Sequence, residues 1–408
     1  MRICLDLRRP ADCGVGRVAV NVAQILGHLS SIRDFELVFL VTGETLQSFE
    51  NIFPGVPRII SNSRFFSMED MFELPYFLKD KIDVFWSNQF YISPFFQCPV
   101  ITMIHDIWPV KFPQWLPNHD EVEKRHGSDV MEAAEKIVTH FENEMYKSLD
   151  IPAQDLYGKR CGLFDKYMFA SMYLAAQEAT VIVTCSNYSR HQITGLLPQY
   201  QKKLKLLSPF VRGQALAHVK PSLARDRILM VAKFDPRKNH RFFLSSLQDL
   251  FSMRQHESTV EVFIIGDVGY RTFGKDLMRL GKSLERHPHQ ISFTGSISER
   301  QLWEYYSSAD LLVFPSSDEG FGLPLLEALE AGVPTLVSNR GALPEVGGAF
   351  AQYSSLASPA TFASEMDKIL RNKDEAFKRA RHGQDYAARK YSFQAAVAQV
   401  EEVLSTIS

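Results

Sequence analysis

Two carboxylates and a glycine-rich loop form the stretch of this chain with the clearest capacity for chemistry. The centre of the stretch reads EGFGLPLLE, with Glu319 and Glu327 at its ends. The apolar run before it predicts a buried strand, and the helical spacing of the leucines within it predicts a helix. Such a helix presents free backbone N–H groups at its positive end, where an anion can be held without a cationic side chain. The predicted anion-binding positions are Gly320, Phe321, Gly322 and Leu323.

A second set of residues supplies positive charge. Lys233, Arg237 and Lys238 follow directly on a strand predicted from Arg227 to Ala232. A run of cations is usually a solvated surface. At the carboxyl end of a strand in a doubly wound parallel sheet, however, these side chains would face the crevice in which ligands bind.

Together these residues resemble the E-x7-E signature of the retaining nucleotide-sugar glycosyltransferases of family four, which have the GT-B architecture. The resemblance implies that Glu319 contacts the donor sugar near its reacting carbon, that Glu327 binds the ribose hydroxyls and that Arg237 and Lys238 neutralise the diphosphate. The family has Gly-Arg where this chain has Ala232-Lys233. Lys233 therefore keeps the charge but loses the bidentate geometry of arginine, which makes Lys238 the stronger candidate.

The resemblance also implies contacts at the ends of other predicted strands. Alone, these signals are weak, because a histidine–aspartate pair or a G-x-G turn is more often structural. Within the family pattern they predict a histidine at the donor sugar, a tight turn over the donor phosphates, a turn beside the nucleotide and a backbone contact to the base. The corresponding residues are, in that order, His105, Gly14 with Gly16, Gly266, and Ser296 with Ile297.

Length and pattern predict an α/β protein of two doubly wound domains, and the resemblance implies that these Rossmann-like domains face each other across a cleft, the GT-B fold. At 408 residues the chain exceeds what a single hydrophobic core usually supports, and predicted strands alternate with helices. We expect an N-terminal domain with a partly helical insert, a linker and a C-terminal domain; the resemblance implies that the first lies on the acceptor side, that the second binds the nucleotide sugar and that the last helix crosses back to the first domain. Their expected ranges are 1–210, about 109–165, 211–226, 227–392 and 393–408.

Composition excludes several classes of protein. The formal net charge of -2 argues against a nucleic-acid-binding protein. The five cysteines are scattered and lack C-x-x-C spacing, so neither a zinc site nor a disulfide framework is indicated, and a reducing cytosol fits best. No apolar stretch reaches about 18 residues, and no signal peptide is evident. We therefore expect a cytoplasmic protein, at most peripheral at the inner face of the membrane.

The resemblance implies transfer of a hexose from a nucleotide sugar to a saccharide or lipid-linked glycan, with mannose from GDP-mannose favoured. No D-x-D sequence occurs, so we expect no metal and no cofactor besides the nucleotide sugar. No carboxylate is an evident nucleophile, which favours same-face transfer over double displacement. The alternatives are a UDP-sugar donor, an epimerase or phosphorylase of the same fold, and a sugar-nucleotide-binding protein without catalysis. The Ala232-Lys233 departure from the family pattern leaves this last alternative open.

Overall fold

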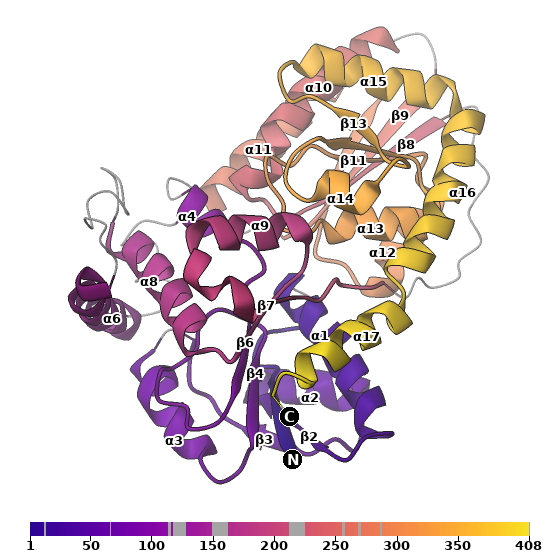
Figure 1. Cartoon of the computed structure of the whole chain (residues 1–408). Coiled ribbons are helices and arrows are strands. Elements are labelled where there is room, and N and C mark those ends of the chain that lie inside the picture. Colours follow the sequence, from indigo (N-terminus) through magenta and orange to yellow (C-terminus); the bar gives the residue numbers. More distant parts are fainter. Residues whose placement is uncertain are drawn as a thin grey trace. The chain divides into compact units, whose positions relative to one another are not determined.

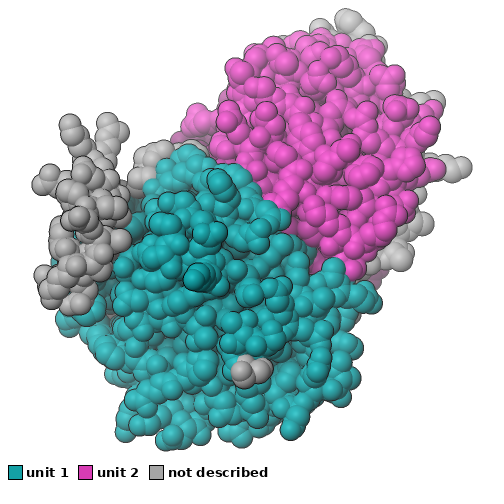
Figure 2. Space-filling view, viewed as in Figure 1, with its two compact units in different colours: residues 1–209, 393–408 teal, residues 210–392 magenta. Residues whose placement is uncertain are grey.

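The computed structural model describes residues 1–11, 14–65, 67–112, 116, 128–148, 162–211, 225–254, 258–267, 271–285 and 288–407. Internal contacts divide the chain into two compact units (Figure 2). Unit 1 contains Met1–Pro209 and Phe393–Ser408, and unit 2 contains Phe210–Ser392. Most of the expected linker, and much of the expected insert at about 109–165, lie outside the described residues. None of the described helices is both long enough and apolar enough to cross a membrane.

Unit 1 is built on a seven-stranded sheet in the order β3-β2-β1-β4-β5-β6-β7, and all of its strand pairs are parallel (Figure 1). The central strands are buried along almost their whole length, as expected when helices cover both faces of a parallel sheet. The strands are β1 (Arg2–Asp6), β2 (Glu36–Val41), β3 (Arg58–Ile60), β4 (Val84–Ser87), β5 (Val100–Met103), β6 (Val181–Thr184) and β7 (Leu204–Leu206).

Helices separate these strands in the sequence except between β4 and β5, and the last helix of the chain also belongs to unit 1. That last helix, α17, contacts α1 and β7, and the ring of its Phe393 lies 5.5 Å from the ring of His28 on α1. The helical segments are α1 (Gly14–Ser30), α2 (Gly43–Ile52), η1 (Glu69–Glu73), α3 (Leu74–Leu78), α4 (Trp108–Lys111), α6 (Ser128–Ser148), α8 (Leu163–Glu178), α9 (Asn187–Leu196), η4 (Pro198–Lys203) and α17 (Phe393–Leu404).

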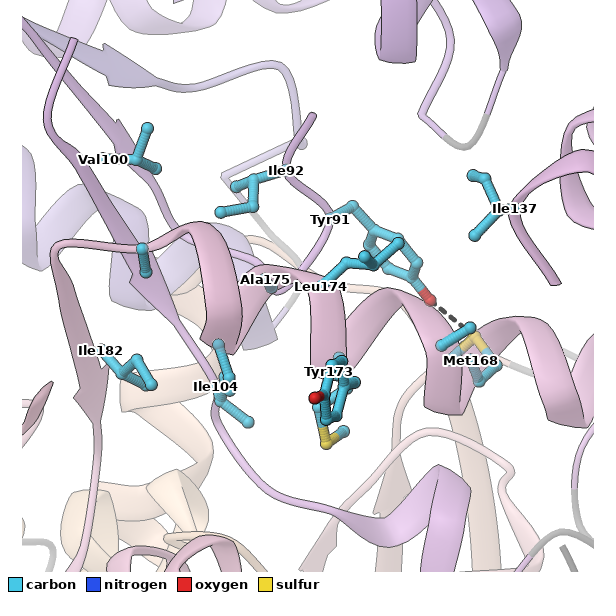
Figure 3. Close-up of a cluster of buried hydrophobic side chains, with 14 of the residues drawn as sticks. Tyr91, Ile92, Val100, Ile104, Ile137, Met168, Tyr173, Leu174, Ala175 and Ile182 are labelled. Atoms are coloured by element: carbon cyan, nitrogen blue, oxygen red, sulfur yellow. Dashed lines mark hydrogen bonds between the residues drawn. The ribbon is translucent and has the colours of Figure 1, made fainter. Parts of the chain in front are cut away.

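The core of unit 1 surrounds α8, in which every residue from Tyr167 to Ala176 is buried. A helix that is apolar on all sides must be enclosed by other elements. Part of this enclosure is α6, whose Phe141 ring lies 5.8 Å from that of Phe169. Figure 3 shows the cluster, with the Tyr91 hydroxyl directed at the sulfur of Met168 at 2.6 Å. The described part of the expected insert therefore contributes to the core.

Unit 2 is built on a six-stranded parallel sheet in the order β10-β9-β8-β11-β12-β13 (Figure 1). The β8–β9 ladder is its longest, running from Arg225 opposite Thr259 to Val231 opposite Ile265. The strands are β8 (Arg225–Val231), β9 (Thr259–Ile265), β10 (Gln290–Gly295), β11 (Leu311–Phe314), β12 (Thr335–Ser338) and β13 (Gln352–Ser354).

The helices of unit 2 follow the expected alternation with strands. Ser298 caps α12 by accepting a hydrogen bond from the N–H of Gln301, and the Gln301 side chain accepts one from the N–H of Ser298, which completes a capping box. The helical segments are η5 (Pro236–Lys238), α10 (His240–Met253), α11 (Arg271–Leu284), α12 (Glu299–Ser308), α13 (Leu323–Glu330), α14 (Leu343–Gly347), α15 (Pro359–Arg371) and α16 (Lys373–Lys390). The predicted fold class, two doubly wound α/β domains, is confirmed.

Each sheet has one point at which the strand order reverses. In unit 2 the chain builds β8, β9 and β10 in one direction and then adds β11 on the other side of β8. Unit 1 does the same with β1, β2 and β3 before β4. Ligands of doubly wound sheets bind at the carboxyl ends of the two strands that meet at this point. In unit 2, these are the ends of β8 and β11.

Candidate active site

An ion pair joins the two loops that meet at the reversal point of unit 2. Lys238 lies in the loop after β8 and Glu319 in the loop after β11. The Lys238 Nζ lies 2.5 Å from Glu319 Oε1, and Arg237 Nη1 lies 3.7 Å from Glu319 Oε2. All three side chains are largely buried. The structure thus brings together the predicted cations Arg237 and Lys238 with the predicted catalytic carboxylate.

The backbone around these residues explains why the pair forms. Asp235 caps η5 by accepting a 2.8 Å hydrogen bond from the N–H of Arg237. Asn239 then takes a left-handed conformation, with φ of 61°, which ends η5 and starts α10. The N–H of Ser317 donates to the carbonyl of Arg237 at 2.8 Å, which ties the loop after β11 to the loop after β8.

The charges around Glu319 favour its ionised form. Burial alone would raise the pKa of the Glu319 carboxyl, but the charges of Lys238 and Arg237 and the hydrogen bond from Lys238 together lower it. Burial is also the main reason why the pKa of Lys238 is lowered, although Glu319 partly offsets this effect. Arg237 and Lys238 together carry one more charge than Glu319, with the Asp235 carboxylate also acting on Lys238, and the two adjacent cations suit the cluster to bind an anion.

The glycine loop leads from Glu319 into α13, as predicted. Gly322 is the N-cap residue of α13 and has a φ of 99°, a conformation that side chains disfavour. A Cβ atom there would also lie 2.6 Å from the Leu343 side chain. The predicted anion-binding residues Gly320, Phe321, Gly322 and Leu323 thus form the last residues of the loop and the first residue of the helix.

Gly341 supports Glu319 from the other side, a contact that the sequence did not reveal. It has a φ of 61°, and a Cβ atom there would lie 2.4 Å from the backbone nitrogen of Glu319. The next N–H, that of Ala342, donates to the Glu319 carbonyl at 2.8 Å. The glycine precedes the sequence ALPEVGG, and only this neighbourhood could have drawn attention to it.

Replacing Gly341 with alanine should therefore displace Glu319. We expect a loss of about 2–4 kcal/mol in the free energy of unfolding and a turnover at least about tenfold lower, because backbone atoms cannot yield as side chains do. The control is Gly332→Ala, which shares a positive φ of 67° but has its nearest atom at 3.6 Å. Denaturant unfolding and a donor-turnover assay on both variants make the comparison. Equal losses in the two variants would contradict a special role for Gly341.

Glu327 lies on α13 and points into the interior of unit 2. It has no exposed surface, and its Oε2 accepts a 2.7 Å hydrogen bond from the hydroxyl of Tyr306 on α12. The same hydroxyl lies 3.3 Å from the carbonyl oxygen of Pro324, in the first turn of α13. Tyr306 was not among the predicted site residues, since its spacing from Trp303 indicates only a buried helix face.

The ends of β8, β9 and β10 form a third part of the site. Gly266 has a φ of 153°, and a Cβ atom there would lie 2.1 Å from the carbonyl oxygen of Ala232. The N–H of Gly266 donates to the carbonyl of Gly295 at 3.1 Å. Gly295 directly precedes the predicted base contacts in the sequence, so Gly266 lies close to them. Those contacts, Ser296 and Ile297, are exposed and half-buried respectively, and Lys233 is exposed.

The remaining predicted residues lie in unit 1. His105 follows β5, and its Nε2 donates to the carbonyl of Asn88 at 2.9 Å. Burial lowers the pKa of the His105 ring, an effect that the Asn88 carbonyl and Asp106 offset in part.

Gly14 and Gly16 were predicted to form a tight turn, which is wrong, because both lie in the first turn of α1. Gly16 lacks a side chain for a packing reason: a Cβ atom would clash with the carbonyl of Pro10.

The buried side chain of His240 makes the stability of unit 2, which contains the candidate site, depend on pH. Its ring is 1% exposed and stacks on Phe234 with centroids 4.6 Å apart, and neither ring nitrogen has a well-formed hydrogen bond among the described residues. Burial lowers the pKa of His240 from 6.5 to about 4, although the Ala232 carbonyl partly offsets the shift.

Because the unfolded chain binds a proton at His240 below about pH 6.5 and the folded chain only near pH 4, stability falls as the pH falls. We expect His240 to make the free energy of unfolding about 2 kcal/mol smaller at pH 5 than at pH 7. Urea unfolding of the wild type and of His240→Phe, which keeps the stack on Phe234, measures this difference. The variant should lose about that much of the pH dependence. An unchanged slope would contradict the assignment.

Comparison with known proteins finds a family model that matches unit 2. Residues 218–390, which nearly coincide with unit 2, match the family model described as glycosyl transferases group 1. Unit 2 thus matches the group 1 model over nearly its whole length, and we call unit 2 the group 1 domain. The Lys238–Glu319 pair, the glycine loop and Glu327 all belong to this group 1 domain.

Relatives and solved structures extend the similarity. The chain is 32% identical over 196 residues to the O-antigen chain mannosyltransferase B of Escherichia coli, covering 45% of this chain and 49% of that protein. It is 36% identical over 132 residues to the serotype-specific mannosyltransferase WbdA of Escherichia coli, covering 32% of this chain and 16% of that protein. The matches thus span half or less of these relatives.

The fold similarity covers both units. The structure of Anabaena HepE in complex with UDP and glucose matches with a TM-score of 0.69 at 15% identity, covering 100% of each chain. This match confirms the predicted GT-B fold. It extends beyond the group 1 domain to unit 1, which the family model does not reach.

Proposed function

We propose that this protein is a retaining glycosyltransferase that moves a hexose from a nucleotide sugar to a saccharide or lipid-linked glycan. The observation that carries the proposal is the cluster of Lys238, Arg237 and Glu319 at the reversal point of the group 1 domain. The cluster combines two adjacent cations with a carboxylate at the start of the glycine loop. A donor with a diphosphate and a sugar needs this combination.

The proposed chemistry centres on the leaving group. Breaking the bond between the anomeric carbon and the phosphate leaves a nucleoside diphosphate with additional negative charge, and interactions that strengthen as this charge develops accelerate the reaction. Lys238, Arg237 and the N–H groups of residues 320–323 would supply them, and we propose that no metal is needed. The departing phosphate oxygen would take the proton of the acceptor hydroxyl as the new bond forms on the same face of the sugar.

Glu319 and Glu327 have separate proposed roles. Glu319 would accept hydrogen bonds from the donor sugar near its reacting carbon. Glu327 would accept hydrogen bonds from the ribose hydroxyls. Because its carboxylate has no exposed surface, a neighbouring group must move aside before the ribose reaches it.

For the donor we favour GDP-mannose. The supporting observation is that two relatives at 32% and 36% identity are named as mannosyltransferases. A UDP-sugar is the second candidate, because HepE, which has the same fold, was solved with UDP and glucose. We propose a saccharide or lipid-linked glycan as acceptor and action in the cytoplasm or at the inner face of the membrane.

The experiment that tests the proposal is a panel of labelled nucleotide sugars. Purified protein is incubated with GDP-mannose, UDP-glucose, UDP-galactose and UDP-N-acetylglucosamine, with and without EDTA, in the presence of mannose-containing glycans. We expect release of GDP from GDP-mannose, unaffected by EDTA, and an α-linked product by NMR. Tight donor binding without turnover of any sugar would indicate a binding protein instead, and inversion of the anomeric configuration would refute retention.

A further inference from the structure

The contact between Tyr306 and Glu327 joins two helices of the group 1 domain. Tyr306 lies near the end of α12 and Glu327 on α13, and both side chains are fully buried. The hydroxyl lies 2.7 Å from Glu327 Oε2 and 3.3 Å from the carbonyl oxygen of Pro324. A single hydroxyl therefore contacts both the carboxylate and the first turn of the helix that bears it.

Physical chemistry gives this contact more weight than an average hydrogen bond. Burying a carboxylate is strongly unfavourable unless the group is hydrogen-bonded, and bonds to charged acceptors are about twice as strong as those between neutral groups. Tyrosine has few rotatable bonds, and the Tyr306 ring is held against Trp303 with centroids 5.6 Å apart. The hydroxyl is thus a rigid donor that fixes the orientation of the carboxylate.

The position of α12 connects this contact to the nucleotide. The helix begins directly after Ser296 and Ile297, the predicted base contacts, and Ser298 caps it. Near its other end it carries Tyr306. Pro324, the second group within reach of the hydroxyl, follows directly on the residues proposed to hold the diphosphate. One helix therefore extends from the predicted base turn to the carboxylate predicted to bind the ribose.

We infer that Tyr306 is a positioning residue, whose hydroxyl orients Glu327 toward the ribose of the bound nucleotide. The inference rests on the proposed function, in which Glu327 binds the ribose hydroxyls. It predicts that Tyr306 affects nucleotide affinity through those hydroxyls and through no other part of the ligand. If the contact only holds α12 against α13, its loss would weaken the binding of every nucleotide equally.

Calorimetry separates these two roles. The affinities of GDP and UDP, and of their counterparts that lack both ribose hydroxyls, are measured for the wild type, for Tyr306→Phe and for Tyr305→Phe. Tyr305 is the neighbouring residue on α12 and is half-buried, so it is the matched control. We expect the wild type and Tyr305→Phe to prefer the ribonucleotide by about 30-fold, and Tyr306→Phe by less than about fivefold. Affinity for the hydroxyl-free ligand should be the same in all three.

Three results would overturn the inference. A preference in Tyr306→Phe as large as in the wild type would show that the hydroxyl does not orient Glu327 for the ribose, while leaving the proposed function intact. A wild type that binds both kinds of nucleotide equally would remove the ribose role of Glu327. A wild type that binds neither GDP nor UDP would refute the proposed function and this inference together.

A second measurement covers the case in which Tyr306→Phe does not fold. In a crystal structure of the wild type with its preferred nucleoside diphosphate, we expect Tyr306 to remain hydrogen-bonded to Glu327 while the carboxylate contacts the ribose. A carboxylate that leaves Tyr306 in order to reach the ribose would overturn the inference.

Discussion

Replacing Lys238 with methionine should lower turnover of the donor by about 100-fold or more. The amine is the cation closest to Glu319, and we propose that it stabilises the charge on the departing diphosphate. Removing one preorganised group of this kind typically lowers turnover by about 10²–10³-fold. Methionine keeps the length and most of the volume of the lysine side chain, so the change removes mainly charge.

The same substitution has a second expected effect, on stability. It takes away the 2.5 Å partner of a buried carboxylate, which should lower the free energy of unfolding by about 3–5 kcal/mol. Turnover must therefore be measured on protein shown to be folded by circular dichroism. Lys378→Met, at an exposed position of α16, is the control and should behave as the wild type. A folded Lys238→Met protein with wild-type turnover would contradict the proposed role of this amine.

Replacing Glu319 with glutamine should separate binding from catalysis. In the ligand-free protein, the carboxylate occupies the two cations that the diphosphate would need, with Oε1 on Lys238 and Oε2 near Arg237. Loss of its negative charge leaves the cluster more positive. We therefore expect the affinity for the nucleoside diphosphate to rise about fivefold or more, while turnover falls at least about tenfold because the donor sugar loses a charged acceptor near its reacting carbon.

Calorimetry with GDP and UDP and a turnover assay with the active donor measure both effects. Glu375→Gln, at an exposed position in the first turn of α16, is the control that changes the net charge by the same amount. Unchanged turnover would refute the role of Glu319 at the reacting carbon. Weaker binding of the diphosphate would show that the carboxylate helps to form the anion site and does not compete for it.

The interior strands could be predicted from the sequence almost to the residue. The strand predicted before the glycine loop is Leu311–Phe314, and the strand predicted from Arg227 to Ala232 is Arg225–Val231, because strands covered on both faces are continuous apolar runs. The strands β3, β7 and β13 were not predicted. Each has only three residues and lies at the edge of its sheet, where its pairing with a single neighbour leaves little trace in the sequence.

The candidate site was predictable where its residues are close in sequence. The E-x7-E spacing identified Glu319 and Glu327, and the cation run identified Arg237 and Lys238, which the structure brings to Glu319. Contacts that depend on tertiary packing were not predictable. Tyr306 and Tyr305 are adjacent tyrosines, and only the fold shows which of them reaches Glu327.

The glycines were the least reliable signal. Gly14 and Gly16 have the spacing of a phosphate-binding turn, yet they lie within α1, and Gly16 is explained by its close contact with Pro10. Gly341 has no motif spacing of its own, yet it lies against the backbone of Glu319. A glycine can serve a turn, a close approach or a ligand, and the sequence does not distinguish among these uses.

The contact of α17 with α1 and β7 has a consequence for biosynthesis. Residues 1–209 leave the ribosome first, yet the helix that completes their unit is made only after all of residues 210–392. Contacts between such distant parts of a chain form slowly, and incomplete domains expose apolar surface in the meantime. The surfaces of α1 and β7 that α17 covers remain exposed until the whole second unit has been translated. The first half of the protein is therefore the more exposed to chaperones and aggregation during synthesis.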